Sequence, residues 1–591
     1  MCGIAGVFMR EGEASLDVLD KLAQALAHRG PDEQGHFRKG RIGLAHTRLS
    51  IIDVQHGHQP FVSPAGNVLI ANGEIYNDLD LRRELEGTPF KTASDCEPPL
   101  YLYERFGEAY AHKLRGMYAI AIHDAVADRL IVSRDRFGIK QIYYAETAAG
   151  FAFASEPQAL VAAGLVPAGV DATHRAELLQ MQFTTGETTI FPGIRRVLPG
   201  ETLVVEDGRL VRRLSSDIMA PRPSLIGKDV DADTALEQLG VLLKETTLAH
   251  MRSDVPYGLF LSGGIDSAAL MVAMTEVTSQ PIVALTAAFP DAPTKDESAK
   301  ARHVAGRLKA DHHIVELRAE DFFKDMPALA AALDDPTTDA SALPLFMLAR
   351  EARKLGLKVA LSGEGADELF GGYKRYRRST WFGGLWRERT RTRGIIERSP
   401  ASAAPFAHWR DGIAAVERVE AAAGRTAMQR LQDIDCQAWL PNDLLLKLDR
   451  CLMAHGIEGR TPYLDNRLSP FAYALPNSLK VKGRYGKWLL RAWLAKHLPS
   501  ADPWAKKQGF VVPAGKWLTQ YRQSIEPLLV RHPAIVEMGL AGRIAEVFDD
   551  PKKAQAGWNL LFYALWHSHH VLGVESGGTV AEVLAETRFA A

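Results

Sequence analysis

The sequence predicts a chain of two parts: a layered α+β N-terminal domain, then an α/β domain built on a parallel sheet, with a mainly helical C-terminal part. Residues 1–205 hold many short β-type runs separated by turn residues. From about residue 234, buried apolar runs alternate with segments of helical periodicity, which is typical of a parallel sheet. We expect domains at 1–210 and 234–520, a linker at 211–233 and a helical extension at 521–591.

Composition narrows the class of protein. The chain has 591 residues, 47% of them apolar, and a formal net charge of -1. That balance argues against a dedicated nucleic-acid or acidic-membrane binder. Four cysteines are too few for a disulfide scaffold, no run approaches the ~20 apolar residues of a membrane helix, and the N-terminus lacks the pattern of a secretory signal. We therefore expect a multidomain enzyme of a reducing, cytoplasmic compartment, with no nucleic-acid or membrane partner; a homodimer stays an open alternative.

The expected elements of the first half are short strands with two helices among them. The runs IAGVF, RIGLAHTRLSIID, NVLIANGEIY, MYAIAIHD, RLIVSRD and GFAFASE indicate strands, and helices are expected near 16–28 and 96–107. The Pro-, Ser- and Asp-rich residues 215–233 are typical of a linker.

The second half predicts strand alternating with helix. TALEQLGVLLKETTLAHM and SAALMVAMTEV have helical spacing, whereas YGLFLS, PIVALTAAF and KVALSGEG are short buried strands. Ligands of such a sheet bind at the carboxyl ends of the strands. Residues 376–400 are locally basic, which we interpret as a solvated helix or loop rather than a nucleic-acid contact, and residues from about 430 onward are mainly helical.

The second residue is a cysteine. Once Met1 is removed, Cys2 carries both a thiol and a free α-amine. A thiolate is a strong nucleophile, and an α-amine of pKa ~7.7–8.0 is a base that works near neutral pH. Cys2 alone predicts little, since many chains carry an inert cysteine at this position.

The surroundings of Cys2 strengthen the prediction. CGIAGVF, HRGPDEQG, AHTRLSIID, NGEIYN and SDCE follow one another within the first 97 residues. This ordered set resembles the class II glutamine amidotransferase domain, of the N-terminal nucleophile hydrolase type. The resemblance implies that Cys2 attacks the carboxamide of glutamine and releases ammonia. It also implies that Asn72 and the backbone N–H of Gly73 form the oxyanion hole.

The same resemblance assigns the groups that hold glutamine. Arg48 would bind the α-carboxylate, because a guanidinium matches a planar carboxylate. Asp95 and Glu74 would take the α-ammonium side. We interpret Cys96 as a packed apolar residue.

A second motif, SGGIDS at residues 262–267, follows an apolar strand and opens a helix. Two glycines let the backbone approach an anion, and a helix N-terminus adds N–H donors. No Gly-Lys-Ser/Thr follows, so this is not a Walker loop. It resembles the pyrophosphate loop of the ATP pyrophosphatases. The residues that would contact ATP there are Ser262, Gly263, Gly264, Asp266 and Ser267, and Asp266 would also hold Mg²⁺.

A third motif, LSGEGADE at residues 361–368, places three carboxylates after another apolar strand. Such groups are costly to bury unless they meet a cation or a polar substrate. The motif resembles the asparagine-synthetase family. The resemblance implies that Ser362 and Gly363 contact the nucleotide and that Asp367 shares Mg²⁺ with Asp266. Glu364 would assist acyl-adenylate formation and the ammonia step.

Three further residues are assigned by this resemblance alone. Leu261 would border the adenosine, Ala287 lies where the family binds adenine through its backbone, and Lys487 would neutralise phosphate charge during adenylation. LPNDLLLKLDRCLMAHGIEGRTPYLDNRL resembles the acceptor-side segment of the family. We interpret most of its charged residues as structural, orienting the site and the domain interface: Asp449, Arg450, Glu458, Arg460 and Asp465.

Together the two halves resemble the glutamine-hydrolysing asparagine synthetase family. The implied substrates are glutamine, ATP and L-aspartate, with Mg²⁺ as cofactor, a β-aspartyl-AMP intermediate, and AMP and pyrophosphate as co-products of asparagine. Ammonia would cross a water-poor, apolar interface between the domains. Three alternatives stay open: a relative that amidates a different carboxylate, a non-catalytic regulator, and a stand-alone glutaminase.

Overall fold

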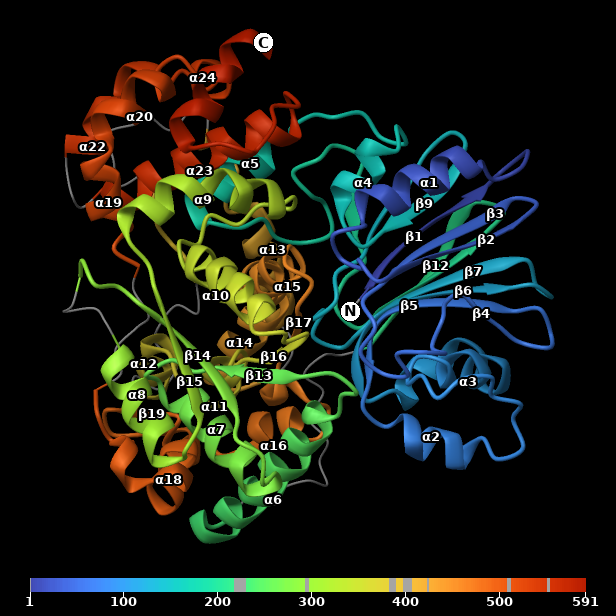
Figure 1. The fold of residues 1–591 in the computed structure, drawn as a ribbon, viewed down its shortest axis with the longest axis horizontal. Coiled ribbons are helices and arrows are strands. Elements are labelled where there is room, and N and C mark those ends of the chain that lie inside the picture. Colours follow the sequence, from blue (N-terminus) through green and yellow to red (C-terminus); the bar gives the residue numbers. More distant parts are fainter. Residues whose placement is uncertain are drawn as a thin grey trace.

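The structure is a computed structural model that describes residues 2–216, 230–292, 297–381, 390–396, 406–421, 425–506, 512–549 and 553–590. Within these residues the chain forms two halves that meet along a broad interface, and its N-terminus lies between them (Figure 1). A helical region that contains the C-terminus lies beside the second half (Figure 1). Among the described residues no helix is long and apolar enough to cross a bilayer.

The first half consists of two six-stranded, antiparallel sheets. One has the order β10-β8-β9-β1-β3-β2 and the other β12-β11-β7-β6-β5-β4. The strands of the first sheet are β1 (Cys2–Met9), β2 (Glu33–Lys39), β3 (Ile42–Arg48), β8 (Tyr143–Glu146), β9 (Gly150–Ala154) and β10 (Arg195–Arg196). Those of the second are β4 (Phe61–Val62), β5 (Val68–Ile75), β6 (Gly116–Asp124), β7 (Arg129–Arg134), β11 (Glu201–Glu206) and β12 (Arg209–Ser215).

The two sheets pack face to face through one apolar core. Ile4 and Phe8 of β1 lie in that core with Ile70 of β5 and Val132 of β7. Alternate residues along a strand point to opposite faces, so the outer faces bury a second set of side chains under helices. The helices of this half are α1 (Leu16–Ala25), α2 (Asp78–Glu84), α3 (Pro98–Phe106), α4 (Pro157–Ala162) and α5 (Ala172–Met181).

The second half is built on a five-stranded parallel sheet of order β15-β14-β13-β16-β17. Its strands are β13 (Tyr257–Phe260), β14 (Val283–Ala288), β15 (Asp311–Glu316), β16 (Val359–Leu361) and β17 (Glu458–Arg460). The helices around it include α6 (Ala232–Met251), α7 (Ile265–Val277), α8 (Ser298–Arg307), α10 (Ala342–Lys354), α15 (Leu445–Met453) and α18 (Trp488–His497). The strand order reverses between β13 and β16, which is where open α/β sheets bind ligands.

The C-terminal helices pack onto the first half as well as the second. They include α19 (Ala514–Gln520), α20 (Arg522–Leu529), α22 (Ile544–Asp549), α23 (Ala554–His570) and α24 (Val580–Ala590), with α9 (Ala319–Ala332) beside them. Helix α23 lies against α5 of the first half (Figure 1), and the Asn559 side chain donates a 3.0 Å hydrogen bond to the Leu179 carbonyl. The extension therefore joins the two halves.

The predicted fold class is confirmed: antiparallel sheets, then a parallel sheet, then helices. The two helices expected in the first half are present as α1 and α3, but α2, α4 and α5 were not expected. Strand β12 continues to Ser215, past the start of the expected linker, and residues 217–229 of that linker lie outside the described residues. The division into domains stays a prediction.

Two of the five parallel strands, β15 and β17, were not predicted from the sequence. Strand β15 has the polar sequence DHHIVE because it is an edge strand with partly exposed residues, and β17 has only three residues. Much of the basic 376–400 segment lies outside the described residues. Arg391 within it is not simply solvated, because its guanidinium packs on the rings of Phe183 and Trp439.

Candidate functional site

The candidate nucleophile lies at the first position of strand β1. Cys2 is the cross-strand partner of Arg48 on β3, and it is buried, with 7% of its surface exposed. Burial raises the pKa of its thiol, so a base must remove the proton before the sulfur can attack. The Arg29 Nε donates to the Cys2 carbonyl at 3.1 Å and fixes the backbone at this point.

Asn72 on β5 faces the nucleophile. Its Oδ1 accepts a 3.0 Å hydrogen bond from the Cys2 nitrogen. Its Nδ2 is buried and has no hydrogen-bond partner among the described residues. A buried donor without a partner is costly, and one held beside a nucleophile matches what an oxyanion requires. Gly73 follows, where a Cβ would lie 2.3 Å from the Met117 carbonyl oxygen, so the close pairing of β5 with β6 requires glycine.

Arg48 is buried and shapes the loop that follows β3. Its guanidinium donates to the carbonyls of Asp53 at 2.7 Å and Val54 at 3.2 Å, and it forms a 3.2 Å ion pair with Glu33. The predicted carboxylate-binding arginine is therefore already held in one orientation. Fixing a long side chain in advance reduces the entropy lost when a substrate binds.

The two predicted ammonium-binding carboxylates differ in their surroundings. Asp95 accepts a 2.7 Å hydrogen bond from the Ile75 backbone N–H, and burial raises its pKa to about 6. Glu74 forms a 2.9 Å ion pair with Arg460, which belongs to strand β17 of the second half. Glu74, predicted to serve the glutamine site alone, therefore also forms a contact across the interface between the halves.

The second candidate site lies where the strand order reverses. Strand β13 leads into SGGIDS and the adjacent strand β16 leads into SGEGADE, so the two loops meet at the same edge of the sheet. Within the first loop the Ser262 Oγ accepts from the Gly264 N–H at 3.2 Å and lies 3.0 Å from the Ser267 Oγ. Helix α7 begins at Ile265, so its N-terminus faces the space between the loops.

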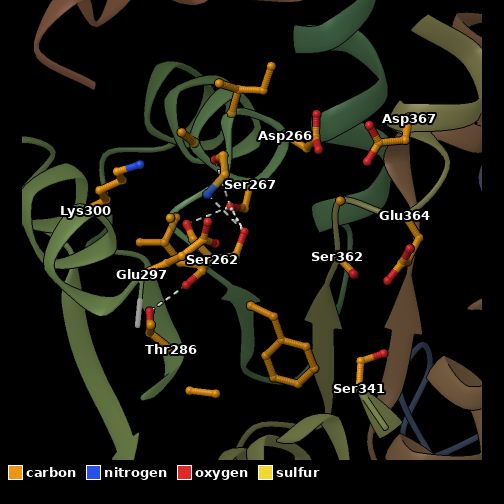
Figure 2. Close-up of a pocket in the computed structure, with 18 of the residues that line it drawn as sticks. Ser262, Asp266, Ser267, Thr286, Glu297, Lys300, Ser341, Ser362, Glu364 and Asp367 are labelled. Atoms are coloured by element: carbon orange, nitrogen blue, oxygen red, sulfur yellow. Dashed lines mark hydrogen bonds between the residues drawn. The ribbon is translucent and has the colours of Figure 1, made fainter. Parts of the chain in front are cut away.

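The two loops enclose a pocket of about 460 Å³ (Figure 2). Thr286 of β14 donates a 2.5 Å hydrogen bond to the Leu261 carbonyl and ties the first loop to the next strand. Every residue assigned to ATP by sequence lines this pocket: Leu261, Ser262, Gly263, Gly264, Asp266, Ser267, Ala287, Ser362, Gly363, Glu364, Asp367 and Lys487.

Lys487 joins the two predicted metal-binding carboxylates. Its ammonium lies 2.6 Å from Asp266 Oδ2 and 2.6 Å from Asp367 Oδ1, and Figure 2 shows the two carboxylates facing one another across the top of the pocket. The two carboxylates raise the pKa of Lys487 to about 12. Lys487 also has φ 53°, a left-handed backbone conformation that costs ~1–3 kcal/mol in a non-glycine residue and clusters at functional sites.

Glu364 points into the pocket from the second loop (Figure 2). Burial raises its pKa to about 7, with Asp367 adding to the effect and Lys447 opposing it. A carboxyl group with this pKa gains and loses a proton near neutral pH, as a general acid or base must.

The donor set fits a divalent cation only in part. Asp266 and Asp367 already face a common cation, the Lys487 ammonium, and carboxylate oxygens suit Mg²⁺. The described residues contain no group of three His, Cys, Asp or Glu side chains placed to hold a metal ion. The remaining ligands of a Mg²⁺ ion would therefore have to be phosphate oxygens and water.

Several pocket residues were missed by sequence analysis. Asp339, Ser341 and Lys447 line one wall, and Arg491 and Lys300 add positive charge near the loops. Lys447 occurs within LLLKLDR, where its spacing is that of any polar helix position, so no local signal marks it.

The interface between the halves contains buried ion pairs as well as apolar side chains. Arg29 donates to Asp449 at 2.8 Å and to Glu156 at 2.7 Å, and Arg450 donates to Asp334 at 2.7 Å. Apolar residues of the first half, among them Met117, share a core with residues of the second. The interface was expected to be apolar, but it also contains buried charged residues. Their burial is tolerated because each charge is paired with an opposite one.

Comparisons with known proteins match each half of the chain to a family. A family model described as asparagine synthase matches residues 238–568, and one described as a glutamine amidotransferase domain matches residues 1–214. An asparagine synthetase [glutamine-hydrolyzing] 1 of Bacillus subtilis is 29% identical, covering 97% of each chain. A putative asparagine synthetase [glutamine-hydrolyzing] of Mycobacterium bovis is 31% identical, covering 96% of this chain and 97% of its own.

A third relative carries a different name. It is the amidase chyE of Penicillium rubens, 29% identical over 82% of this chain and 83% of its own. The matches to the two family models together cover nearly all of the chain up to residue 568, and each falls on one of the two sites described above. The chain is an enzyme that belongs to the asparagine synthase family and carries an N-terminal glutamine amidotransferase domain.

Proposed function

We propose that the protein converts L-aspartate to L-asparagine, using ATP and the ammonia released from glutamine. The observation that supports this most strongly is Lys487 between Asp266 and Asp367, at 2.6 Å from each. This arrangement places a cation and two carboxylates beside a glycine-rich loop, as a site that splits ATP into AMP and pyrophosphate requires.

The glutaminase reaction begins at Cys2. The α-amine removes the thiol proton, and the sulfur attacks the carboxamide carbon of glutamine. The Asn72 Nδ2 and the Gly73 N–H stabilise the negative charge on the oxygen, because they are fixed before the reaction begins. Ammonia leaves, and water hydrolyses the resulting thioester to glutamate.

The synthetase reaction takes place in the pocket of the second half. A side-chain oxygen of aspartate attacks the α-phosphorus of ATP, the bond to the bridging oxygen breaks, and pyrophosphate leaves with β-aspartyl-AMP as the product. Asp266 and Asp367 would hold Mg²⁺, which neutralises phosphate charge when bound. Lys487 pairs with both carboxylates and would balance the charge of the departing pyrophosphate.

Ammonia then completes the reaction. Its nitrogen attacks the acyl carbon, the bond to AMP breaks, and the nitrogen loses a proton. We propose that Glu364 accepts this proton, because its side chain lies in the pocket and burial raises its pKa to about 7. Ammonia passes from the Cys2 site to the pocket through the interface between the halves. The apolar core that the halves share there keeps it from bulk water.

The test is an acceptor screen with the purified enzyme. Aspartate, glutamate and a peptide carboxylate are each supplied with ATP, glutamine and Mg²⁺, and pyrophosphate release and product mass are measured. Asparagine should form with aspartate, and glutamate should fail, because one extra methylene displaces its carboxylate from the α-phosphorus. A preference for the peptide would instead favour the alternative that the protein amidates a carboxylate other than that of aspartate.

A further inference from the structure

One wall of the ATP pocket is built from charged residues that no nucleotide motif contains. Asp339 and Ser341 precede helix α10, and Lys447 lies on α15. All three line the same pocket as the SGGIDS and SGEGADE loops, and Figure 2 shows Ser341 on the side of the pocket away from Asp266 and Asp367. This charged wall, defined as Asp339, Ser341 and Lys447, therefore lies apart from the proposed magnesium and pyrophosphate groups.

The three residues of the charged wall hold one another in place. The Lys447 ammonium donates to Asp339 Oδ2 and, at 2.7 Å, to the Ser341 Oγ. The second oxygen of Asp339 accepts the Ser341 backbone N–H at 3.0 Å. Lys447 is 5% exposed, and a buried charge of this kind is costly to keep unless it is paired.

The elements behind the wall are also fixed. The Thr337 hydroxyl donates to Asp443 at 2.6 Å, and the Trp439 indole donates to the other oxygen of the same carboxylate at 2.6 Å. Thr338 donates its N–H to the Gln182 carbonyl of the first half at 2.8 Å. The wall is therefore held rigidly enough to orient a small ligand.

The charged wall complements the head group of an amino acid. An ammonium group has three N–H donors, and Lys447 directs two of them to partners among the described residues, which leaves one for a ligand in the pocket. An α-amino acid carries one ammonium and one carboxylate on adjacent atoms. Such a zwitterion placed alongside the Lys447–Asp339 pair meets an opposite charge at each end.

We propose that Lys447 binds the α-carboxylate of the acceptor amino acid and that Asp339 binds its α-ammonium. This inference rests on the function proposed above and identifies the residues that select an α-amino acid as acceptor. Glu364 lies in the same pocket and within the electrostatic influence of Lys447. The head group bound at the wall thus lies beside the carboxylate that handles the proton of the ammonia step.

The first test compares the KM values of variants. Lys447→Met should raise the KM for aspartate by about 10- to 150-fold, since a hydrogen bond to a charged group is worth ~1.5–3 kcal/mol. The conservative Lys447→Arg should recover part of this loss, and the KM for ATP should change by less than about threefold in both. The matched control is Lys496→Met, an exposed lysine of α18, whose kinetics should equal those of the wild type.

The second test assigns each end of the head group. Succinate lacks the α-ammonium and 3-aminopropanoate lacks the α-carboxylate. The wild type should prefer aspartate over succinate, and Asp339→Asn should reduce this preference by at least about tenfold. The variant lacks the carboxylate that would pair with the α-ammonium of aspartate. Lys447→Met should reduce the preference over 3-aminopropanoate in the same way. Each acceptor is followed by ATP-dependent pyrophosphate release.

The outcomes separate this inference from the proposed function. If the wild type adenylates no aspartate, the proposed function fails. If the wild type makes asparagine but Asp339→Asn and Lys447→Met keep both its KM for aspartate and its preferences, the assignment of the wall is wrong. Thermal unfolding of each variant checks folding. A variant that unfolds early is replaced by Asp339→Ser or Lys447→Gln, whose acceptor preferences should change in the same direction; unchanged preferences would equally overturn the assignment.

Discussion

The two candidate sites differ in how their charged groups are arranged before any substrate binds. In the first half the predicted substrate-holding groups already contact protein: Arg48 binds loop carbonyls and Glu74 pairs with Arg460. In the second half Asp266, Asp367 and Lys487 line the pocket, and one ammonium pairs with both carboxylates.

The difference follows from the substrates. Glutamine is small and has no net charge, so a site whose charged groups are already paired and fixed suffices to orient its amide. ATP and its leaving pyrophosphate carry several negative charges. Their site must therefore supply cations that can follow the negative charge as it builds up on the pyrophosphate. Comparing the two halves therefore suggests that each can be disabled without disabling the other.

The largest expected effect comes from the nucleophile. Cys2→Ala should reduce glutamine-dependent asparagine formation by at least about 10³-fold, since removing a catalytic nucleophile leaves only binding and the oxyanion hole. Synthesis from added ammonium should persist, measured as asparagine formed from ammonium, aspartate and ATP. Loss of the ammonium reaction in a folded Cys2→Ala protein would show that the two halves cannot be disabled independently.

The converse change lies in the second half. Asp367→Asn removes one of the two carboxylates around Lys487 and should lower pyrophosphate release by about 10²–10³-fold. Glutamine hydrolysis, measured as glutamate formed without ATP, should continue. A variant that still releases pyrophosphate at the normal rate and at ordinary Mg²⁺ would show that Asp367 is not needed for the metal and phosphates.

Removing a donor from the predicted oxyanion hole should affect kcat more than KM. Asn72→Ala removes the unpartnered Nδ2 beside Cys2 and should lower kcat for glutamine hydrolysis by about 10²-fold, with a smaller change in KM, because the contact forms mainly in the transition state. Steady-state kinetics of glutamate release provide the measurement. An effect confined to KM would instead assign Asn72 to ground-state binding.

The smallest effect is a pH dependence. Burial raises the pKa of Glu364 to about 7, so this carboxyl is mostly protonated at pH 6 and mostly ionised at pH 8. If its carboxylate accepts the ammonia proton, kcat at a constant concentration of free ammonia should rise by about tenfold between these pH values. Glu364→Gln should be slow and lack this rise; a wild-type profile without it would exclude Glu364 as the base.

Local motifs explain why so much of the site could be predicted. SGGIDS and SGEGADE each follow a buried strand, and parallel strands bring their carboxyl ends to one edge, so the pocket lining followed from sequence order and the resemblance to a family. The N-terminal sheets were predictable for a similar reason, because alternating apolar runs specify strands that bury one face.

Long-range contacts explain what could not be predicted. Arg29 and Asp449 are 420 residues apart in sequence, and nothing in either segment indicates that they pair. The same holds for Glu74 with Arg460, and for Lys447 with Asp339. Each is a polar residue at an ordinary helix, strand or loop position, and its partner is set by how segments far apart in sequence pack together.

The most direct test of the account is an isotope experiment on the acyl-adenylate. Aspartate labelled with ¹⁸O in both oxygens of its side-chain carboxylate is turned over with ATP and glutamine, and the products are analysed by mass spectrometry. If the carboxylate attacks the α-phosphorus, one ¹⁸O must appear in AMP and the other must remain in the amide of asparagine. Unlabelled AMP, or ADP and labelled phosphate in its place, would contradict adenylation of aspartate in the pocket of Asp266, Asp367 and Lys487.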